Sequence, residues 1–298
     1  MKNEINISCI VIGHNSVENL QRLLDSINNL NYKNSDIEII YIDDGSKDDS
    51  LNIFNNYNLK YSKQSIGLAE KKGRMQARLE GVKYAKGKWC FFINSNIVLK
   101  HNIVSEYKKL LQKTNSIGYA GLIQYDSKDQ FFKEYLNHQK RGANNLAHLD
   151  DVPFYNVLFS NCILRTSHII DLKWNKKFTG YGGEELEFFY MLYLKNSTPI
   201  QLCQTAIVYR NNHPSYSEHC KRLENFGNKN FKELECSLQL LVIKNKLFMK
   251  NLSFFNFFLK LILKIVSMSY KTSFKKLNFL FIKVGLWSSI VLGYQKTK

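Results

Sequence analysis

The stretch Ile39–Ser46, with the sequence IIYIDDGS, decides the fold class of this chain. Its apolar half predicts a short buried strand, and the two aspartates with Gly45 end that strand. Ser46 is typical of a helix N-cap and predicts a helix that continues through Phe54.

Strand and helix patterns alternate on both sides of this stretch. Ile5–Ile12 and Trp89–Ile93 predict strands, whereas Val17–Ile27 and Leu68–Ala85 predict helices. Alternating strands and helices are joined by right-handed crossovers, so we expect an α/β fold with a mainly parallel sheet flanked by helices. Ligands of such sheets bind beyond the carboxyl ends of the strands. Asp43 and Asp44 lie at one such end, and the sequence Asn94-Ser95-Asn96 lies at another.

A second polar cluster covers Thr179–Glu187, with the sequence TGYGGEELE. Its glycines predict a tight loop, and its glutamates predict the first turns of a helix, where carboxylates suit the positive end of the helix dipole.

The composition excludes several protein classes. A content of 44% hydrophobic and 13% aromatic residues excludes a largely disordered chain. The net charge of +17 predicts an anionic partner: a nucleic acid, a phosphate-bearing ligand or an anionic membrane. Six scattered cysteines without a CxxC pair predict a reduced, cytoplasmic protein with neither a disulfide framework nor a zinc site. The first apolar run is too short, and is followed too soon by polar residues, to predict a signal peptide.

The composition changes after Glu235, beyond which eleven lysines and no acidic residue follow. Phe254–Met268 is apolar around Lys260 and Lys264, and Leu277–Tyr294 falls just short of a membrane span. We therefore predict a domain over 1–235 and a helical, basic tail over 236–298 that lies on an anionic membrane surface. The alternative is that these helices pack back on the domain.

Taken together, these patterns resemble family 2 glycosyltransferases of the GT-A fold, over roughly residues 5–235. The stretch Ile39–Ser46 matches the family signature VVDDGS, and Thr179–Glu187 is similar to the motif GxGGEDxE. Three further segments resemble stretches of the family sequence and occur in the same order as there: Ile7–Asn15, the stretch from Gly67 through Arg78 to Gly87, and Tyr209–Pro214.

The resemblance implies a nucleotide-sugar donor, most simply a UDP-sugar. Asp44 would accept a hydrogen bond from the uracil N–H; the alternative is a turn aspartate that caps a helix. Arg78 would brace Asp44 or approach the phosphates bidentately, and the alternative is a solvated helix charge.

The chain departs from the family at its metal site. Asn94 and Asn96 stand where the family has an Asp-x-Asp that binds Mg²⁺ or Mn²⁺. An amide oxygen coordinates hard cations without contributing charge, so we expect a weakened metal site or stabilisation of the leaving group by Lys or Arg. His213 would be a further ligand beside Asn96, as the resemblance implies, unless it is a structural histidine. No organic cofactor is expected.

Glu185 is the predicted catalytic base, because inverting transfer needs a carboxylate within reach of the acceptor hydroxyl. Glu184 and Asn161 are predicted to bind the acceptor. The alternative for the acidic pair is an ordinary helix N-terminus.

These residues predict an inverting hexosyltransferase of cell-surface polysaccharide synthesis, acting on a saccharide or lipid-linked saccharide at the inner face of the cell membrane. A non-catalytic nucleotide-sugar or glycan-binding homologue is the alternative, suggested by Asn94 and Asn96. Nucleic-acid binding is a third class, suggested by charge alone. We expect no nucleic-acid partner, because the sequence contains no recognisable nucleic-acid-binding motif.

Overall fold

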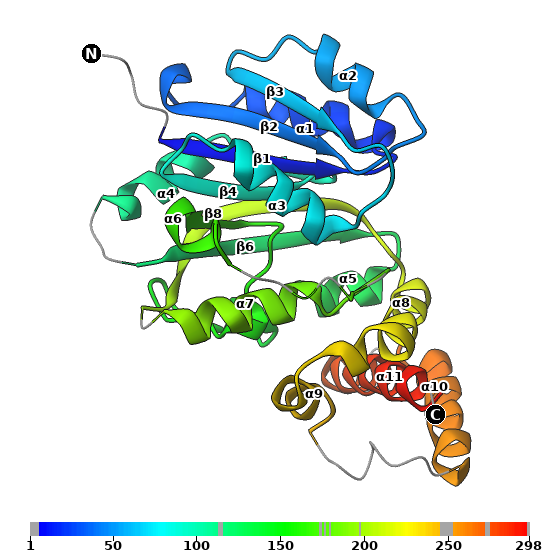
Figure 1. Ribbon diagram of the computed structural model, residues 1–298. Coiled ribbons are helices and arrows are strands. Elements are labelled where there is room, and N and C mark those ends of the chain that lie inside the picture. Colours follow the sequence, from blue (N-terminus) through cyan, green and yellow to red (C-terminus); the bar gives the residue numbers. More distant parts are fainter. Residues whose placement is uncertain are drawn as a thin grey trace. The chain divides into compact units, whose positions relative to one another are not determined.

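The computed structural model describes residues 6–112, 116–172, 175, 177–178, 180–196, 198–244, 253–271 and 275–296 (Figure 1). The strands are β1 (Ile7–Gly13), β2 (Ile37–Asp43), β3 (Ser62–Gly67), β4 (Trp89–Asn94), β5 (Ile97–Leu99), β6 (Gly118–Ser127), β7 (Cys162–Arg165) and β8 (Ile200–His213). The α-helices are α1 (Val17–Asn28), α2 (Ser50–Asn56), α3 (Arg74–Tyr84), α4 (Ile103–Leu111), α5 (Gln130–Leu136), α6 (Thr166–Ile169), α7 (Glu184–Lys195), α8 (Tyr216–Lys229), α9 (Cys236–Ile243), α10 (Ser253–Ser269) and α11 (Lys275–Gln295).

The chain divides into two compact units. The first comprises residues 1–126, 139–173 and 189–211, and the second comprises 127–138, 174–188 and 212–298. This division differs from the boundary at residue 235 that the composition indicates. Whether residues 236–298 form a domain of their own stays a prediction.

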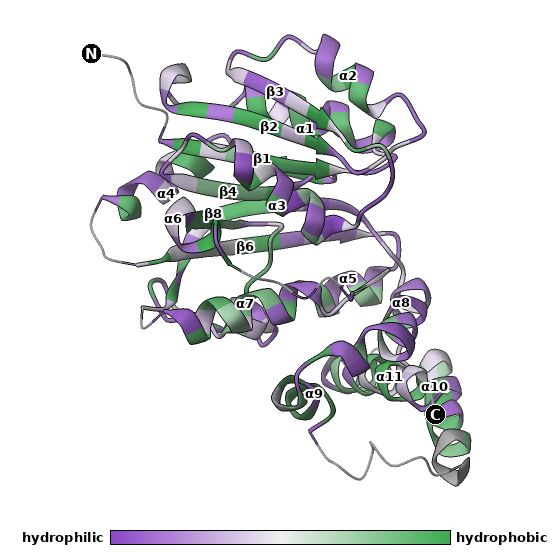
Figure 2. Ribbon diagram, viewed as in Figure 1, coloured by the Kyte–Doolittle hydropathy of each residue, from purple (hydrophilic) through white to green (hydrophobic). Residues whose placement is uncertain are grey.

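One sheet runs in the order β3-β2-β1-β4-β7-β6-β8-β5. Its first half is parallel: β1 pairs with β2 and β4, and β2 pairs with β3. Every residue of β1 and β2 is buried, and these strands are mostly green in Figure 2. The second half is antiparallel at the β4–β7, β6–β7 and β5–β8 pairs. The predicted parallel sheet therefore covers the first four strands in this order.

In this half, one strand was not predicted, and the start of one helix was predicted at the wrong residue. Strand β3, with the polar sequence SKQSIG, gave no apolar signal because its side chains are exposed or half-buried. Helix α2 begins at Ser50 instead of after Ser46. Ser46 is no helix cap; its Oγ accepts a hydrogen bond of 2.8 Å from the Asn15 N–H.

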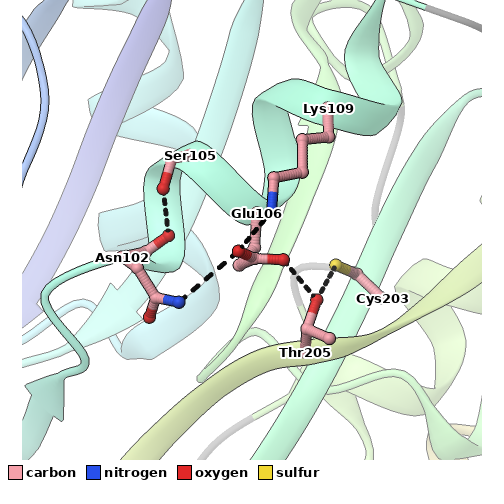
Figure 3. A network of polar contacts seen from close by, with 6 residues as sticks. All are labelled: Asn102, Ser105, Glu106, Lys109, Cys203 and Thr205. Atoms are coloured by element: carbon pink, nitrogen blue, oxygen red, sulfur yellow. Dashed lines mark hydrogen bonds and ion pairs between the residues drawn. The ribbon is translucent and has the colours of Figure 1, made fainter.

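Glu106 joins helix α4 to strand β8 (Figure 3). Its carboxylate accepts hydrogen bonds from Lys109 Nζ at 2.7 Å and from Thr205 Oγ1 at 2.7 Å. These two bonds lower the pKa of Glu106 below its usual value of 4.5.

Replacing Glu106 by glutamine is expected to lower the free energy of unfolding at neutral pH by roughly 0.5–1 kcal/mol. A carboxylate whose pKa is lowered by folding stabilises the fold above its unfolded pKa, and this stabilisation is lost as the pH falls through the lower folded value. Urea unfolding of both proteins at neutral pH and below pH 4.5 measures this. Glu80→Gln, which removes one ion pair with Lys83, is the control. An equal difference at both pH values would contradict the assignment.

In the second unit, α11 packs against α8 and α5, and α10 packs against α11. Helix α8 begins with a capping box formed by Ser215 and Glu218. Among the described residues, one helix, over Lys276–Gln295, has the length and apolar composition to cross a membrane, and half of the apolar window in it is buried. Lys246, Lys250 and Lys298 of the basic tail lie outside the described residues.

Candidate active site

Loops at the carboxyl ends of β1, β2 and β4 are joined by hydrogen bonds. The His14 ring lies 2.9 Å from the carbonyl oxygen of Asp44, through Nδ1. Ser95 donates its N–H to Ile12 O at 2.9 Å, and its hydroxyl lies 2.7 Å from that of Ser16. The predicted polar edge of the sheet is therefore a single connected cluster.

Asp44 is 3% exposed and lies at the end of β2. Its carboxylate accepts hydrogen bonds from the backbone N–H groups of Lys72 at 2.7 Å and Gly73 at 3.0 Å. Burial raises the pKa of Asp44 above its usual 3.8, against the lowering effect of these two bonds. This contact was not predictable from local sequence, because only the tertiary fold brings Asp44 to the segment before α3.

Arg78 is 1% exposed, so the interpretation as a solvated helix charge was wrong. Its Nη2 donates to Asn94 Oδ1 at 3.0 Å, and its guanidinium lies 4.4 Å from the centre of the Phe159 ring. The Asn94 amide in turn donates to Ser160 Oγ at 2.9 Å. Arg78 therefore places a buried positive charge beside the end of β4.

Asn96 is half-buried and follows β4 at the same edge. Its carbonyl oxygen accepts the N–H of Asn211 at 3.1 Å, next to the β5–β8 pairing. Asn94 and Asn96 thus differ: hydrogen bonds fix the amide of Asn94, whereas backbone pairing fixes the position of Asn96.

Asn161 is 1% exposed, and its amide is used inside the first unit. Oδ1 accepts from Tyr107 Oη at 2.7 Å, and Nδ2 donates to Leu122 O at 2.8 Å and to Ala206 O at 2.9 Å. These three bonds hold the amide inside the first unit and support a structural role for Asn161. That Asn161 binds the acceptor stays a prediction.

The acidic pair Glu184–Glu185 opens helix α7 in the second unit, after a glycine loop. Gly182 and Gly183 have φ values of +89° and +93°, which favour glycine, and a Cβ on Gly183 would lie 2.9 Å from the Phe226 ring. Asn230 Nδ2 donates to Gly182 O at 2.7 Å and fixes the loop from α8. Thr179 lies outside the described residues.

The three glutamates of this segment differ in their surroundings. Glu184 is 5% exposed, whereas Glu185 and Glu187 are half-buried. Burial raises the pKa of Glu187 above its usual 4.5. No role was predicted for Glu187, although it occupies the last position of the same motif.

His213 ends strand β8 and is 7% exposed. Its Nδ1 lies 3.0 Å from Pro214 O, and a neutral ring that donates from Nδ1 carries its lone pair on Nε2. The ring packs near Phe132 and His219, with centroids at 5.6 Å and 5.3 Å.

Asn94, Asn96 and His213 do not provide the carboxylates that a hard dication prefers as ligands. The described residues contain no group of three His, Cys, Asp or Glu side chains that could hold a metal ion. Both ends of the Asn94 amide are already hydrogen-bonded, to Arg78 and to Ser160. We therefore derive no catalytic step through a metal.

A family model described as glycosyl transferase family 2 matches residues 8–172, more than half of the chain. The chain belongs to this family. Its matched region covers the strand-end cluster with Asp44, Arg78, Asn94 and Asn96. The predicted family is thereby confirmed, and with it the expectation of a transferase enzyme.

Two curated relatives match this family 2 chain in part. A glycosyltransferase, GlyG, from Streptococcus pneumoniae is 29% identical over 143 residues, 47% of each protein. A poly(ribitol-phosphate) β-glucosyltransferase from Bacillus spizizenii is 34% identical over 94 residues, 30% of this chain and 14% of that protein. The matches span half or less of these relatives.

Two solved structures share the fold. Staphylococcus aureus TarS (residues 1–349, with UDP-GlcNAc) matches with a TM-score of 0.57 and 15% identity, covering 98% of this chain and 91% of that one. A mannosyltransferase from Pyrobaculum calidifontis, with GDP-Man and Mn²⁺, matches with a TM-score of 0.65 and 10% identity, covering 98% and 88%. These likenesses confirm the predicted GT-A fold.

Proposed function

We propose that this family 2 chain is an inverting glycosyltransferase that uses a UDP-sugar. The observation that supports it most strongly is the family match over the strand-end cluster, in which Asp44, the second aspartate of the DDGS stretch, directly follows β2. A carboxylate has about four acceptor positions, so Asp44 retains acceptor capacity beside its bonds to Lys72 and Gly73. Asp44 would accept the uracil N–H there.

Arg78 would stabilise the diphosphate electrostatically. A buried guanidinium interacts more strongly with an anion than a solvated one does, because the surrounding dielectric constant is low. Its bond to Asn94 and its packing on Phe159 hold it in place without a carboxylate partner at position 94. This arrangement suits a site whose usual acidic pair is replaced by amides.

Glu185 would act as the base. It is more accessible than Glu184, which is 5% exposed. Its carboxylate would take the proton of the acceptor hydroxyl while that oxygen attacks the anomeric carbon of the sugar. The bond from this carbon to the diphosphate would break, and UDP would leave with inversion. Glu184 would hold a neighbouring hydroxyl of the acceptor.

For the acceptor we propose a saccharide or lipid-linked saccharide of a cell-surface polysaccharide, at the cytoplasmic face of the membrane. The name of the poly(ribitol-phosphate) β-glucosyltransferase relative supports a cell-surface polymer. A non-catalytic homologue is the second candidate, because the amides at 94 and 96 remove the charge that usually binds a dication.

A screen of nucleotide sugars for hydrolysis tests this proposal. We expect a UDP-sugar to be hydrolysed faster than GDP-, CDP- or dTDP-sugars, with UDP as the product. Tight binding of a nucleotide sugar without any turnover would favour the non-catalytic homologue. Absence of binding to all of them would contradict both candidates.

The metal dependence is expected to be weak. EDTA should lower hydrolysis by less than about tenfold, because neutral amides attract a dication poorly. Asn96→Asp is the matched variant, since it adds a carboxylate without touching the bond between Arg78 and Asn94. Calorimetry should show tighter Mn²⁺ binding for this variant. Tight Mn²⁺ binding by the unmodified protein with UDP would contradict the prediction.

A further inference from the structure

Helix α10 exposes an apolar stripe. Five of its side chains are between 40% and 75% exposed: Phe257, Phe258, Leu261, Ile265 and Met268. Contiguous large apolar side chains on a surface mark an interaction site. Figure 2 shows both green and purple segments on α10.

Two lysines of α10 border this stripe, and a third follows the end of the helix. At about 100° per residue, the five apolar side chains occupy an arc of about 100°, and Lys260 and Lys264 fall within about 60° beside one edge of it. Lys271 comes just after Ser269, the last residue of α10. All three lysines are exposed. The opposite side of the helix carries the buried residues Leu259 and Val266. The exposed surface is therefore divided lengthwise into an apolar and a cationic part.

A cavity of about 440 Å³ adjoins the cationic part, between α8, α10 and α11. Lys221, Lys264 and Lys271 line it together with the hydroxyl-bearing residues Ser217, Ser267 and Ser289. Its one acidic residue, Glu224, forms an ion pair with Lys296. Ammonium and hydroxyl donors around a space of this size suit a phosphate-bearing headgroup.

We propose that α10 docks on a bilayer rich in anionic phospholipid, with the apolar stripe among the upper acyl chains and a lipid phosphate in this cavity. Lysine stems can lie along apolar surface while their ammonium groups contact lipid phosphates. A second copy of the chain that packs through the same face suits it less well, because no acidic residue follows Glu235 to oppose the lysines. Helix α11 is packed against α8 within the second unit. The inference is independent of the reaction that the chain catalyses.

Co-sedimentation of the full chain with vesicles tests this proposal. The chain should bind vesicles with about one third phosphatidylglycerol and not pure phosphatidylcholine, and about 0.5 M salt should weaken binding. Lys264→Glu with Lys271→Glu should lower the binding constant at least about tenfold. Phe257→Ser with Leu261→Ser and Met268→Ser should also lower it at least about tenfold, since this removes buried apolar area.

Two matched controls keep the result interpretable. Lys86→Glu with Lys128→Glu makes the same charge change at exposed lysines elsewhere, and Met191→Ser with Leu194→Ser removes exposed apolar side chains from α7. Both should bind vesicles like the unmodified chain. Circular dichroism confirms folding of every variant. The proposal is overturned if the full chain ignores anionic vesicles, if the α10 variants bind normally, or if ultracentrifugation shows a dimer that the apolar α10 variant dissociates.

Discussion

Replacing Glu185 by glutamine is expected to lower the turnover number at least about 100-fold, while the affinity for UDP stays nearly unchanged. Glutamine preserves the shape of the side chain but cannot accept the proton of the acceptor hydroxyl. Glu185 lies in the first turn of helix α7 and is half-buried, so an uncharged replacement should fold normally. Steady-state transfer kinetics and calorimetry with UDP measure the two effects.

Glu184→Gln is the matched control for this experiment. Glu184 is buried and adjacent, so we expect its substitution to raise the KM for the acceptor more than it lowers the turnover number. Glu187→Gln tests the third carboxylate of this segment separately. Burial raises the pKa of Glu187. If Glu185→Gln transfers sugar at the unmodified rate and one of the other variants does not, the base is the other glutamate.

The first four strands in the sheet order illustrate what local sequence determines. The apolar runs of β1, β2 and β4 are continuous because these strands are buried on both faces, and their polar ends mark the edge where sheets of this kind bind ligands. Strand β3 has no such run, because its side chains are not buried. A polar edge strand carries too little signal in its own residues to be found.

Local sequence patterns predicted which residues belong to the candidate site better than they predicted the contacts of those residues. Asp44 and Asn94 lie at strand ends, a position that follows from local pattern. The burial of Arg78 against Phe159, and the use of the Asn161 amide by Tyr107, depend on residues far away in the sequence. Such pairings are set by the tertiary fold, so composition and spacing cannot reveal them.

In the basic tail, too, composition alone does not reveal how the helices pack. Its two long helices have similar composition, yet α11 is packed against α8 whereas α10 exposes its apolar stripe. The difference lies partly in glycines, because Gly227 of α8 and Gly293 of α11 allow the two backbones to approach closely. A Cβ on Gly293 would lie 2.0 Å from Glu224 O, and a Cβ on Gly227 would lie 2.1 Å from Ile290 O.

Gly293→Val is therefore expected to lower the free energy of unfolding by at least about 2–3 kcal/mol, because backbone atoms cannot move aside as a flexible side chain can. Gly293→Ala should show a smaller loss. Lys283→Val places the same β-branched side chain at an exposed position of α11 and should cost roughly 1 kcal/mol or less. Urea unfolding monitored by tryptophan fluorescence measures all three.

This experiment also separates a packed α11 from a membrane-spanning one, since its length and composition suit either. A helix that leaves the second unit to cross a bilayer would not need a close contact with α8. In that case Gly293→Val would unfold like the unmodified chain, and the chain would need detergent to stay in solution. A large loss of stability in a detergent-free chain instead requires that α11 be part of the folded unit, which leaves α10 as the helix whose apolar face is available to lipid.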